Sequence, residues 1–283
     1  MSVVFIGTVE FSRYALKGLL DSGTPISAVF TLDAALKGPV SDFAVFDDLL
    51  NGTNIPLFHV DNINSEEVIQ TLQKIQPDLI YCIGWSRLVK QEVLQTAKWG
   101  GIGLHSTLLP EGRGRAPIPW TILKGLQKSG VSLFHLAEAA DSGDIIQQVS
   151  YDIYPDETAT TLYKKVCEAT YRLAKETYPL LATGKASRIK QDESRVTHWT
   201  KRTPQDGLID WQKSSKEIDT LIRAVTHPYP GAFSYLKEKK VIVWKAKAIN
   251  IDSKAVAGTV LSDNEEGIVV KTGDGALLLL NYE

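Results

Sequence analysis

The first 106 residues alternate between short apolar runs and amphipathic stretches, and this alternation restricts the possible folds more than any other feature. The apolar runs are typical of buried strands and lie at 2–7, 26–32, 55–60, 77–85 and 100–106. The stretches between them have apolar residues at helical spacing and lie at 11–23, 41–54, 65–76 and 90–97. Strands joined by helices predict an α/β fold, a Rossmann-like and mostly parallel sheet with helices on both faces.

The pattern changes in the second half of the chain. Residues 130–155 predict a strand, a turn and a strand, and residues 158–184 predict a long helix. A polar, turn-rich stretch and one further helix at 214–227 precede a series of short strands. We therefore expect a catalytic domain at 1–189, a linker at 190–206, and a small antiparallel β (OB-like) C-terminal domain at 207–283.

Composition excludes several classes of protein. Apolar residues make up 43% of the 283 residues and the net charge is −2, so no overall field attracts nucleic acid or an anionic membrane. Two cysteines without a pairing pattern, and an N-terminus without a basic region, suit a cytoplasmic protein. The five histidines show no metal-ligand spacing, so we expect no metal.

One histidine lies where ligands bind in such sheets. The carboxyl ends of parallel strands form the ligand crevice, and Gly7, Trp85 and His105 all fall at predicted strand ends. Asp141 follows in the turn DSGD, and a carboxylate can fix the tautomer of a catalytic histidine and stabilise its charged form. The alternative is a histidine that is satisfied within the core.

The stretch HSTLLPEGRGRAPIPW, together with FIGTVEF, DSGDI and RAVTHPYPGAFSY, resembles the N10-formyltetrahydrofolate-dependent formyltransferases. The motifs keep their order over nearly the whole chain. The strongest likeness is to sugar-nucleotide N-formyltransferases that act on UDP-4-amino-4-deoxyarabinose, and it rests on KRTPQDGLIDW, KVIVWKAKAI and GDGALLL. The resemblance implies a formyltransferase with N10-formyltetrahydrofolate as co-substrate.

The resemblance also implies a catalytic trio of Asn, His and Asp, in which His105 and Asp141 keep their places and Gly103 stands at the position of the Asn. The Asn amide would donate to the oxygen that becomes negative during transfer, a contact worth about 3 kcal/mol in comparable acyl transfers. Three interpretations stay open. In the first, His105, Asp141 and a water suffice for transfer at a lower rate. In the second, another donor replaces the Asn amide, for example Asn62, Asn64 or a backbone N–H beside Gly103. In the third, transfer activity has been lost.

The remaining site residues are also implied by the resemblance. The folate would contact the loop after the fourth strand and the DSGD turn, at Trp85, Ser86, Arg87, Leu88, Val89 and Asp144. The substrate would contact Arg113, Arg115, Arg202 and Tyr229. Some of these residues have a structural role as the alternative: an ion pair or a solvated position for the substrate arginines, a cap for Asp144, and a closed domain contact for Tyr229. Trp120 is expected in the core.

We therefore expect a cytoplasmic enzyme that formylates the amino group of a nucleotide-linked amino sugar in glycan biosynthesis. Methionyl-tRNA is a weaker alternative, because the stretch 32–43, which matches the basic tRNA-binding loop of that subfamily, holds a single lysine. A folate-binding protein without transfer activity is a third, motivated by Gly103. The net charge of −2 leads us to expect no nucleic-acid or membrane partner, and a homodimer through the C-terminal domain stays open.

Overall fold

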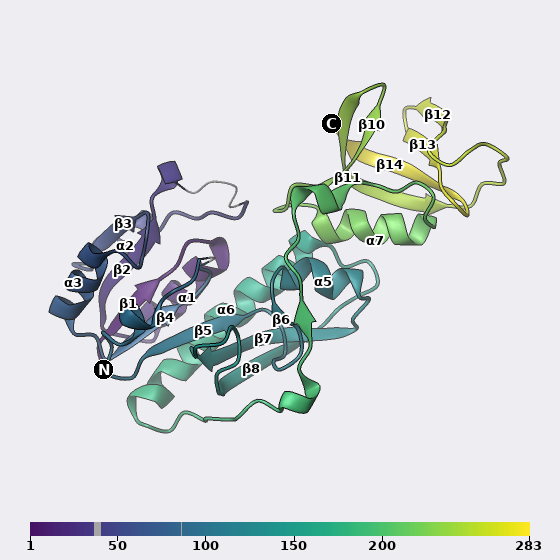
Figure 1. Cartoon of the computed structure of the whole chain (residues 1–283). Coiled ribbons are helices and arrows are strands. Elements are labelled where there is room, and N and C mark those ends of the chain that lie inside the picture. Colours follow the sequence, from purple (N-terminus) through teal and green to yellow (C-terminus); the bar gives the residue numbers. More distant parts are fainter. Residues whose placement is uncertain (37–40, 86) are drawn as a thin grey trace. The chain divides into compact units, whose positions relative to one another are not determined.

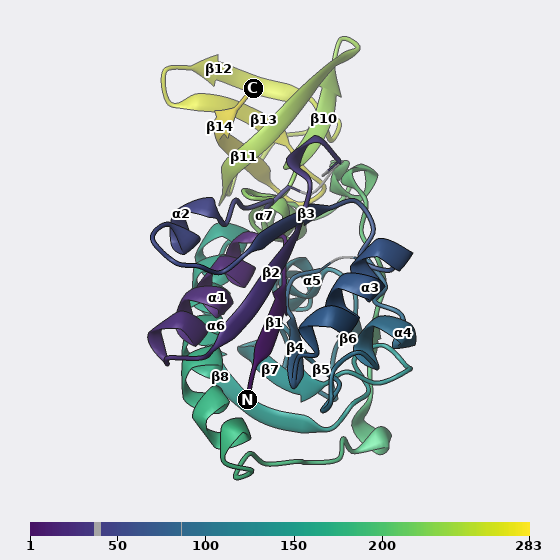
Figure 2. The ribbon, with the colours of Figure 1, turned by 90° about the vertical axis from the view of Figure 1, so that its left-hand side faces the viewer.

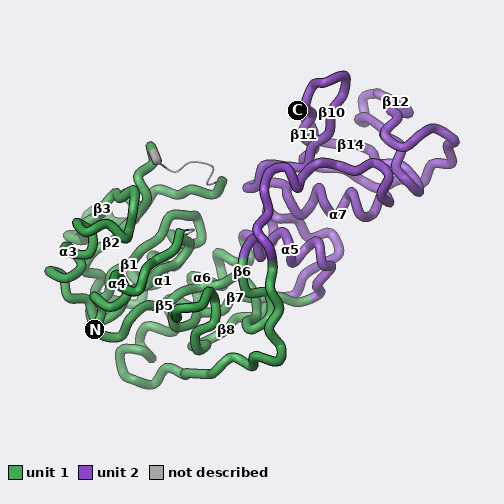
Figure 3. The backbone as a smooth tube through the Cα atoms, viewed as in Figure 1, with its two compact units in different colours: residues 1–114, 128–151, 164–199 green, residues 115–127, 152–163, 200–283 purple. Residues whose placement is uncertain are grey.

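The computed structural model describes residues 1–36, 41–85 and 87–283 and divides into two compact units (Figure 3). Unit 1 comprises residues 1–114, 128–151 and 164–199. Unit 2 comprises residues 115–127, 152–163 and 200–283. The units interleave along the chain, whereas the sequence predicted three consecutive segments, so the boundaries at 189 and 206 stay a prediction.

A seven-stranded sheet forms the centre of unit 1 (Figures 1 and 2). Its strand order is β3-β2-β1-β4-β5-β7-β8, and β7 runs antiparallel to β5. The strands are β1 (Val3–Ile6), β2 (Ile26–Leu32), β3 (Leu57–Val60), β4 (Leu79–Cys82), β5 (Gly101–His105), β7 (Lys128–His135) and β8 (Ile145–Asp152). The predicted α/β class is confirmed, and the order places the ends of β4 and β5 side by side.

Helices cover both faces of this sheet (Figure 2). On one face lie α3 (Glu66–Ile75) and α4 (Gln91–Leu94), whose residues Val68, Leu72 and Val93 pack in a buried cluster with β1, β2 and β4. On the other face lie α1 (Glu10–Asp21) and α6 (Ala159–Ala182). Gly18 permits their close approach, because a Cβ there would lie 2.5 Å from the carbonyl oxygen of Tyr171.

The helix predicted at 41–54 is mostly wrong. Only α2 (Asp47–Leu50) is helical, and the residues before it run along α1 and the end of β1. The N–H of Ala44 donates to the Thr8 carbonyl at 2.9 Å, and Phe46 is fully buried. Alternate residues point inward here, and that period belongs to extended backbone rather than to a helix.

Three short elements were not predicted. Helix α5 (Pro117–Leu123) begins with a proline at its first position, where the missing N–H is no loss. The two-residue strands β6 (Arg113–Gly114) and β9 (His198–Trp199) pair in parallel. Two residues are too few to produce a periodic pattern in a sequence.

Unit 2 contains a five-stranded antiparallel sheet in the order β10-β11-β14-β13-β12 (Figure 1). Its strands are β10 (Ala232–Leu236), β11 (Lys239–Ile249), β12 (Val260–Asn264), β13 (Gly267–Lys271) and β14 (Ala276–Tyr282). Helix α7 (Ser215–Val225) packs on the sheet and begins with a capping box between Ser214 and Glu217. The predicted small β domain is thus confirmed as an antiparallel sheet.

None of the helices in the described part of the chain combines the length and the apolar character that a membrane span requires. Outside positions 37–40 and 86, no group of three His, Cys, Asp or Glu side chains gathers in a way that would hold a metal ion.

Candidate active site

His105 is the last residue of β5 and lies buried at the carboxyl edge of the sheet, with 7% of its surface exposed. Its Nε2 atom lies 2.7 Å from the carbonyl oxygen of Gly112. Its Nδ1 atom faces Asp141, with 3.8 Å between Nδ1 and Oδ2. The histidine and carboxylate predicted from the sequence are therefore brought together.

Asp141 lies in the tight turn between β7 and β8. Its φ angle is +55°, a left-handed conformation that Asp tolerates better than most residues. Its Oδ2 atom accepts a hydrogen bond from the Gly114 N–H at 2.9 Å. Position 143, two residues after Asp141, must be glycine, because a Cβ there would lie 1.7 Å from the His135 carbonyl oxygen. Backbone contacts therefore fix the carboxylate that faces His105.

Gly103 lies on β5 two residues before His105, so both positions face the same side of the sheet. A Cβ at Gly103 would lie 2.7 Å from Cδ2 of Leu136 and 3.1 Å from the ring of Phe134. These two side chains belong to a small apolar cluster with Leu109 and Ile145. Apolar side chains therefore occupy the place that a polar side chain at position 103 would take.

Asn64, one of the amides considered as a replacement donor, has a structural role. Its Nδ2 donates to the Leu88 carbonyl at 2.8 Å, and its Oδ1 accepts from the Lys90 N–H at 2.8 Å. Asn62 in turn accepts from the Asn64 N–H at 3.0 Å. Asn64 thus holds the loop after β4 in shape, and we do not include it among the candidate donors.

That loop, residues 84–90, begins at the carboxyl end of β4. Trp85 and Val89 pack against the buried cluster under α3 and α4, while Leu88 is 74% exposed. The Arg87 guanidinium donates to the Asp61 carbonyl. Ser86, predicted to contact the folate, lies outside the described residues. Asp144, the other predicted contact, forms an ion pair with Arg188 at 2.8 Å.

Several buried polar atoms at this edge have no hydrogen-bond partner in the described part of the chain. They are Oγ1 of Thr8 after β1, Oγ1 of Thr31 near the end of β2, Nε1 of Trp85 after β4, and Oγ1 of Thr107 after β5. A buried unpaired polar group costs about 1–3 kcal/mol, so such atoms are usually satisfied by water or a ligand. The edge therefore suits a ligand rich in donors and acceptors, and the pterin of a folate has that chemistry.

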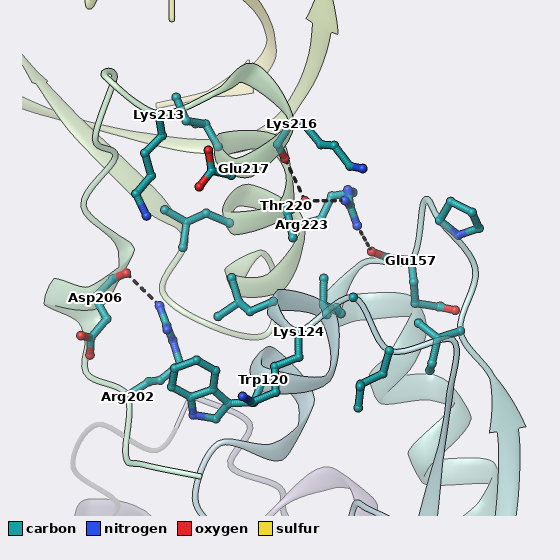
Figure 4. Close-up of a pocket in the computed structure, with 18 of the residues that line it drawn as sticks. Trp120, Lys124, Glu157, Arg202, Asp206, Lys213, Lys216, Glu217, Thr220 and Arg223 are labelled. Atoms are coloured by element: carbon teal, nitrogen blue, oxygen red, sulfur yellow. Dashed lines mark hydrogen bonds between the residues drawn. The ribbon is translucent and has the colours of Figure 1, made fainter. Parts of the chain in front are cut away.

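Unit 2 contains a pocket of about 930 Å³ lined by α5, α7 and the segments around residues 154 and 206 (Figure 4). The Arg202 guanidinium lies 5.1 Å from the centre of the Trp120 ring and donates to the Asp206 carbonyl at 2.8 Å. Desolvation lowers the pKa of Arg202. Trp120 is half-buried in this pocket, so its expected place in the core is wrong.

The charged side chains of this pocket are unevenly paired. Asp206 and Glu217 accept hydrogen bonds from Thr203 and Ser214 and so act as local caps. In contrast, Lys124, Lys213 and Lys216 form no salt bridge within the described chain. Lys124 lies 5.6 Å from the centre of the Trp120 ring, and the pKa of Glu217 is lowered by the hydrogen bonds from Ser214 and then by the charge of Lys213. Basic side chains that form no salt bridge make the pocket suitable for a phosphorylated ligand.

The other predicted substrate contacts lie elsewhere. Arg113 is buried, and its guanidinium pairs with Glu193 at 2.7 Å and with Oε1 of Gln191 at 2.9 Å, the structural role left open above. Arg115 is exposed, and it has no hydrogen bond or salt bridge among the described residues. Tyr229 is half-buried, and its N–H donates to the Thr226 carbonyl at 3.0 Å in the turn after α7.

A parallel sheet with a histidine and a carboxylate at its carboxyl edge is the architecture of an α/β enzyme that acts on a ligand bound there. The formyl transferase family matches residues 3–177, and its C-terminal domain matches residues 201–283. The chain therefore belongs to the formyl transferase family, a family of enzymes, as the sequence resemblance predicted.

Solved structures share this fold. HypX from Aquifex aeolicus, in complex with tetrahydrofolic acid, has a TM-score of 0.71 at 19% identity, over 99% of this chain and 43% of that chain. The N-formyltransferase from Helicobacter canadensis, in complex with folinic acid and dTDP-3-aminofucose, has a TM-score of 0.69 at 17% identity, over 99% of both chains. Methionyl-tRNA formyltransferase from Clostridium thermocellum has a TM-score of 0.61 at 18% identity, over 99% of this chain and 100% of that chain. This chain spans less than half the length of the HypX chains.

Gln191 is a residue that sequence reasoning missed. Its amide bonds to the turn that carries Asp141 and to the side chain of Arg113. The sequence does contain one indication of this role. The stretch QDESRVTHW is rich in side chains that form hydrogen bonds, and a simple linker would not require them.

Proposed function

We propose that the protein transfers a formyl group from N10-formyltetrahydrofolate to the amino group of a nucleotide-linked amino sugar. The observation that carries the transfer chemistry is the pair formed by buried His105 and half-buried Asp141 at the carboxyl edge of β5. Belonging to the formyl transferase family supports the reaction, and the unpaired cations of the unit 2 pocket support the phosphorylated acceptor.

The folate supplies the formyl group when it is bound. In this chain, Asp141 faces Nδ1 of His105 and orients the imidazole. The acceptor amine attacks the formyl carbon, and an N–H of His105 donates to the oxygen that gains negative charge. A water takes the proton that leaves the attacking nitrogen. The bond between the formyl carbon and N10 then breaks, and the His105 N–H gives its proton to N10 as tetrahydrofolate leaves.

His105 must change its hydrogen bonding to act in this way. Its Nε2 atom contacts the Gly112 carbonyl at 2.7 Å. Catalytic hydrogen bonds often form only in the complex with substrate, so this contact is the arrangement without ligand. In the proposal, Nε2 exchanges the Gly112 carbonyl for the formyl oxygen.

Glycine at position 103 limits the number of donors. Leu136 and Phe134 fill the space beside it, so the second donor of this active site is either a water or a backbone N–H. We propose that the pair suffices with a water, because loss of one donor in a group of interacting residues leaves residual catalysis.

The unit 2 pocket would hold the nucleotide. Arg202 and Lys124 lie over the Trp120 ring and, with Lys213 and Lys216, offer charge for a diphosphate. A base or sugar would pack against the apolar side chains of the pocket, such as Leu208 and Leu221.

A panel of UDP-, dTDP- and GDP-linked 3-amino and 4-amino sugars, assayed with N10-formyltetrahydrofolate, tests the proposal. We expect one member to be formylated in preference to the others. Methionyl-tRNA is included as a competing acceptor, and its selective formylation would replace the sugar. Folate binding without formylation of any amine would contradict transfer altogether.

A further inference from the structure

Two loops enclose the pair of His105 and Asp141. Residues 112–114 supply the carbonyl that contacts His105 and the N–H that donates to Asp141. Residues 141–143 form the turn that carries Asp141 itself. The distance between the two side chains therefore depends on how these two loops are held against each other.

A single glutamine bonds to both loops. Nε2 of Gln191 donates to the Asp141 carbonyl at 2.8 Å and to the Gly143 carbonyl at 2.7 Å. Its Oε1 accepts from Nε of Arg113 at 3.1 Å and from a terminal nitrogen of Arg113 at 2.9 Å. Both N–H groups and both lone pairs of the amide are used.

The chemistry of the partners fixes the orientation of this amide. The carbonyls of Asp141 and Gly143 only accept hydrogen bonds, and the Arg113 guanidinium only donates them. A flipped amide would place its oxygen against two carbonyl oxygens and its nitrogen against a cation. Glutamine is therefore the side chain whose ends match both loops.

The segment around Gln191, residues 189–199, also contacts both of these loops through its backbone and side chains. Ile189 exchanges two backbone hydrogen bonds with Ile145 at the start of β8, at 2.8 and 2.9 Å. Further along, Thr197 accepts from the N–H groups of Gly112 and Arg113, at 2.8 and 2.9 Å. This segment, largely predicted as linker, lies across both catalytic loops within unit 1.

The Asp141 turn needs external support. The φ of Asp141 is +55°, a left-handed conformation that costs energy in a residue other than glycine unless its surroundings hold it. Gln191 bonds to the carbonyls of Asp141 and Gly143 and so fixes the turn on either side of Ser142.

We propose that Gln191 is a positioning residue for formyl transfer, which holds the Asp141 turn against the Arg113 loop so that the carboxylate faces His105. The inference rests on the proposed role of the histidine and carboxylate. Gln191 touches no reacting atom in this scheme, and it acts through the geometry of the pair.

Gln191→Glu tests this directly, because it keeps the size and the contact with Arg113 but replaces both donors with an acceptor. We expect kcat to fall about 10- to 100-fold, the usual loss when a supporting hydrogen bond to a functional side chain is removed or its geometry shifts by about 1 Å. The KM values for folate and acceptor should stay unchanged. The imidazole ¹⁵N shifts of His105 should move, a change that general destabilisation would not produce.

Gln147→Glu is the matched control, because Gln147 is also half-buried in unit 1, on β8, and its Oε1 accepts only from Thr177 at 3.2 Å. It should leave kcat and the ¹⁵N shifts unchanged. Gln191→Met keeps the volume and removes all four hydrogen bonds, so it serves as the test if Gln191→Glu does not fold. Wild-type kcat and unchanged ¹⁵N shifts in the folded variant would overturn the inference. An active His105→Ala variant would instead overturn the proposed function, so the two failures are distinguishable.

Discussion

The Nδ1 atom of His105 lies 3.8 Å from Oδ2 of Asp141, and that same oxygen accepts the Gly114 N–H at 2.9 Å. The carboxylate is therefore anchored by the backbone and acts on the imidazole across an ion-pair distance. Its contribution to catalysis should be electrostatic and should depend on its charge.

Asp141→Asn removes that charge while an amide oxygen can still accept from Gly114. We expect kcat to fall about 100- to 10,000-fold, in line with the loss when the carboxylate partner of a catalytic histidine becomes an amide. Steady-state kinetics beside a thermal melt checks this. Asp21→Asn, at an exposed pair with Lys17, is the control and should keep wild-type activity. A decrease of less than tenfold in Asp141→Asn would indicate that the charge is not used.

Gly103→Asn restores the residue that the family resemblance implies, but the structure leaves no room for it. A Cβ would lie 2.7 Å from Leu136, so we expect destabilisation of about 1–3 kcal/mol and a lower rate, the cost of overpacking. Denaturant unfolding and kcat measure the two effects.

Leu136→Ala should relieve this crowding. The double variant Gly103→Asn/Leu136→Ala is therefore expected to be more stable and more active than the sum of the two single changes predicts. Additive effects on the free energy of unfolding and on kcat would show that the Leu136 side chain does not exclude the Asn amide.

The sequence was sufficient to predict the sheet, because apolar runs and helical spacing alternate regularly up to His105. The sequence was insufficient where a segment has no periodic apolar pattern of its own. These segments are the extended path before α2, the short helix α5 that begins with proline, and the paired two-residue strands β6 and β9. The histidine and carboxylate were predictable because the motifs around them resemble those of a known family. The contacts of Gln191 and the crowding at Gly103 were not, because both depend on residues distant in sequence.

Trp85→Phe removes an indole N–H that has no partner within the described residues. No protein hydrogen bond is broken, so any loss of stability should come only from the smaller ring that packs against the buried cluster. If that N–H bonds to the folate, folate affinity should fall about 3- to 10-fold, the effect of about 1 kcal/mol. Fluorescence titration or calorimetry measures this, with Trp99→Phe at an exposed position as control. Unchanged folate affinity in Trp85→Phe would remove Trp85 from the site.

Arg202→Ala removes the guanidinium above Trp120. We expect KM for the nucleotide-linked acceptor to rise at least tenfold with little change in kcat, because charge-assisted hydrogen bonds contribute about 1.5–3 kcal/mol and Arg202 is proposed to bind the nucleotide rather than the reacting groups. Arg172→Ala, at an exposed pair with Glu176, is the matched control. An equal fall in kcat and kcat/KM would instead place Arg202 in contact with the transition state.

The most direct test of the account is the single-turnover rate of formyl transfer by His105→Asn, measured with saturating N10-formyltetrahydrofolate and the preferred amino sugar. Asn at this position keeps a donor but has no titratable group. The account predicts that folate still binds and that transfer falls by about a thousandfold or more, since His105 combines the donor and proton-transfer roles. Transfer within tenfold of the wild-type rate would contradict it.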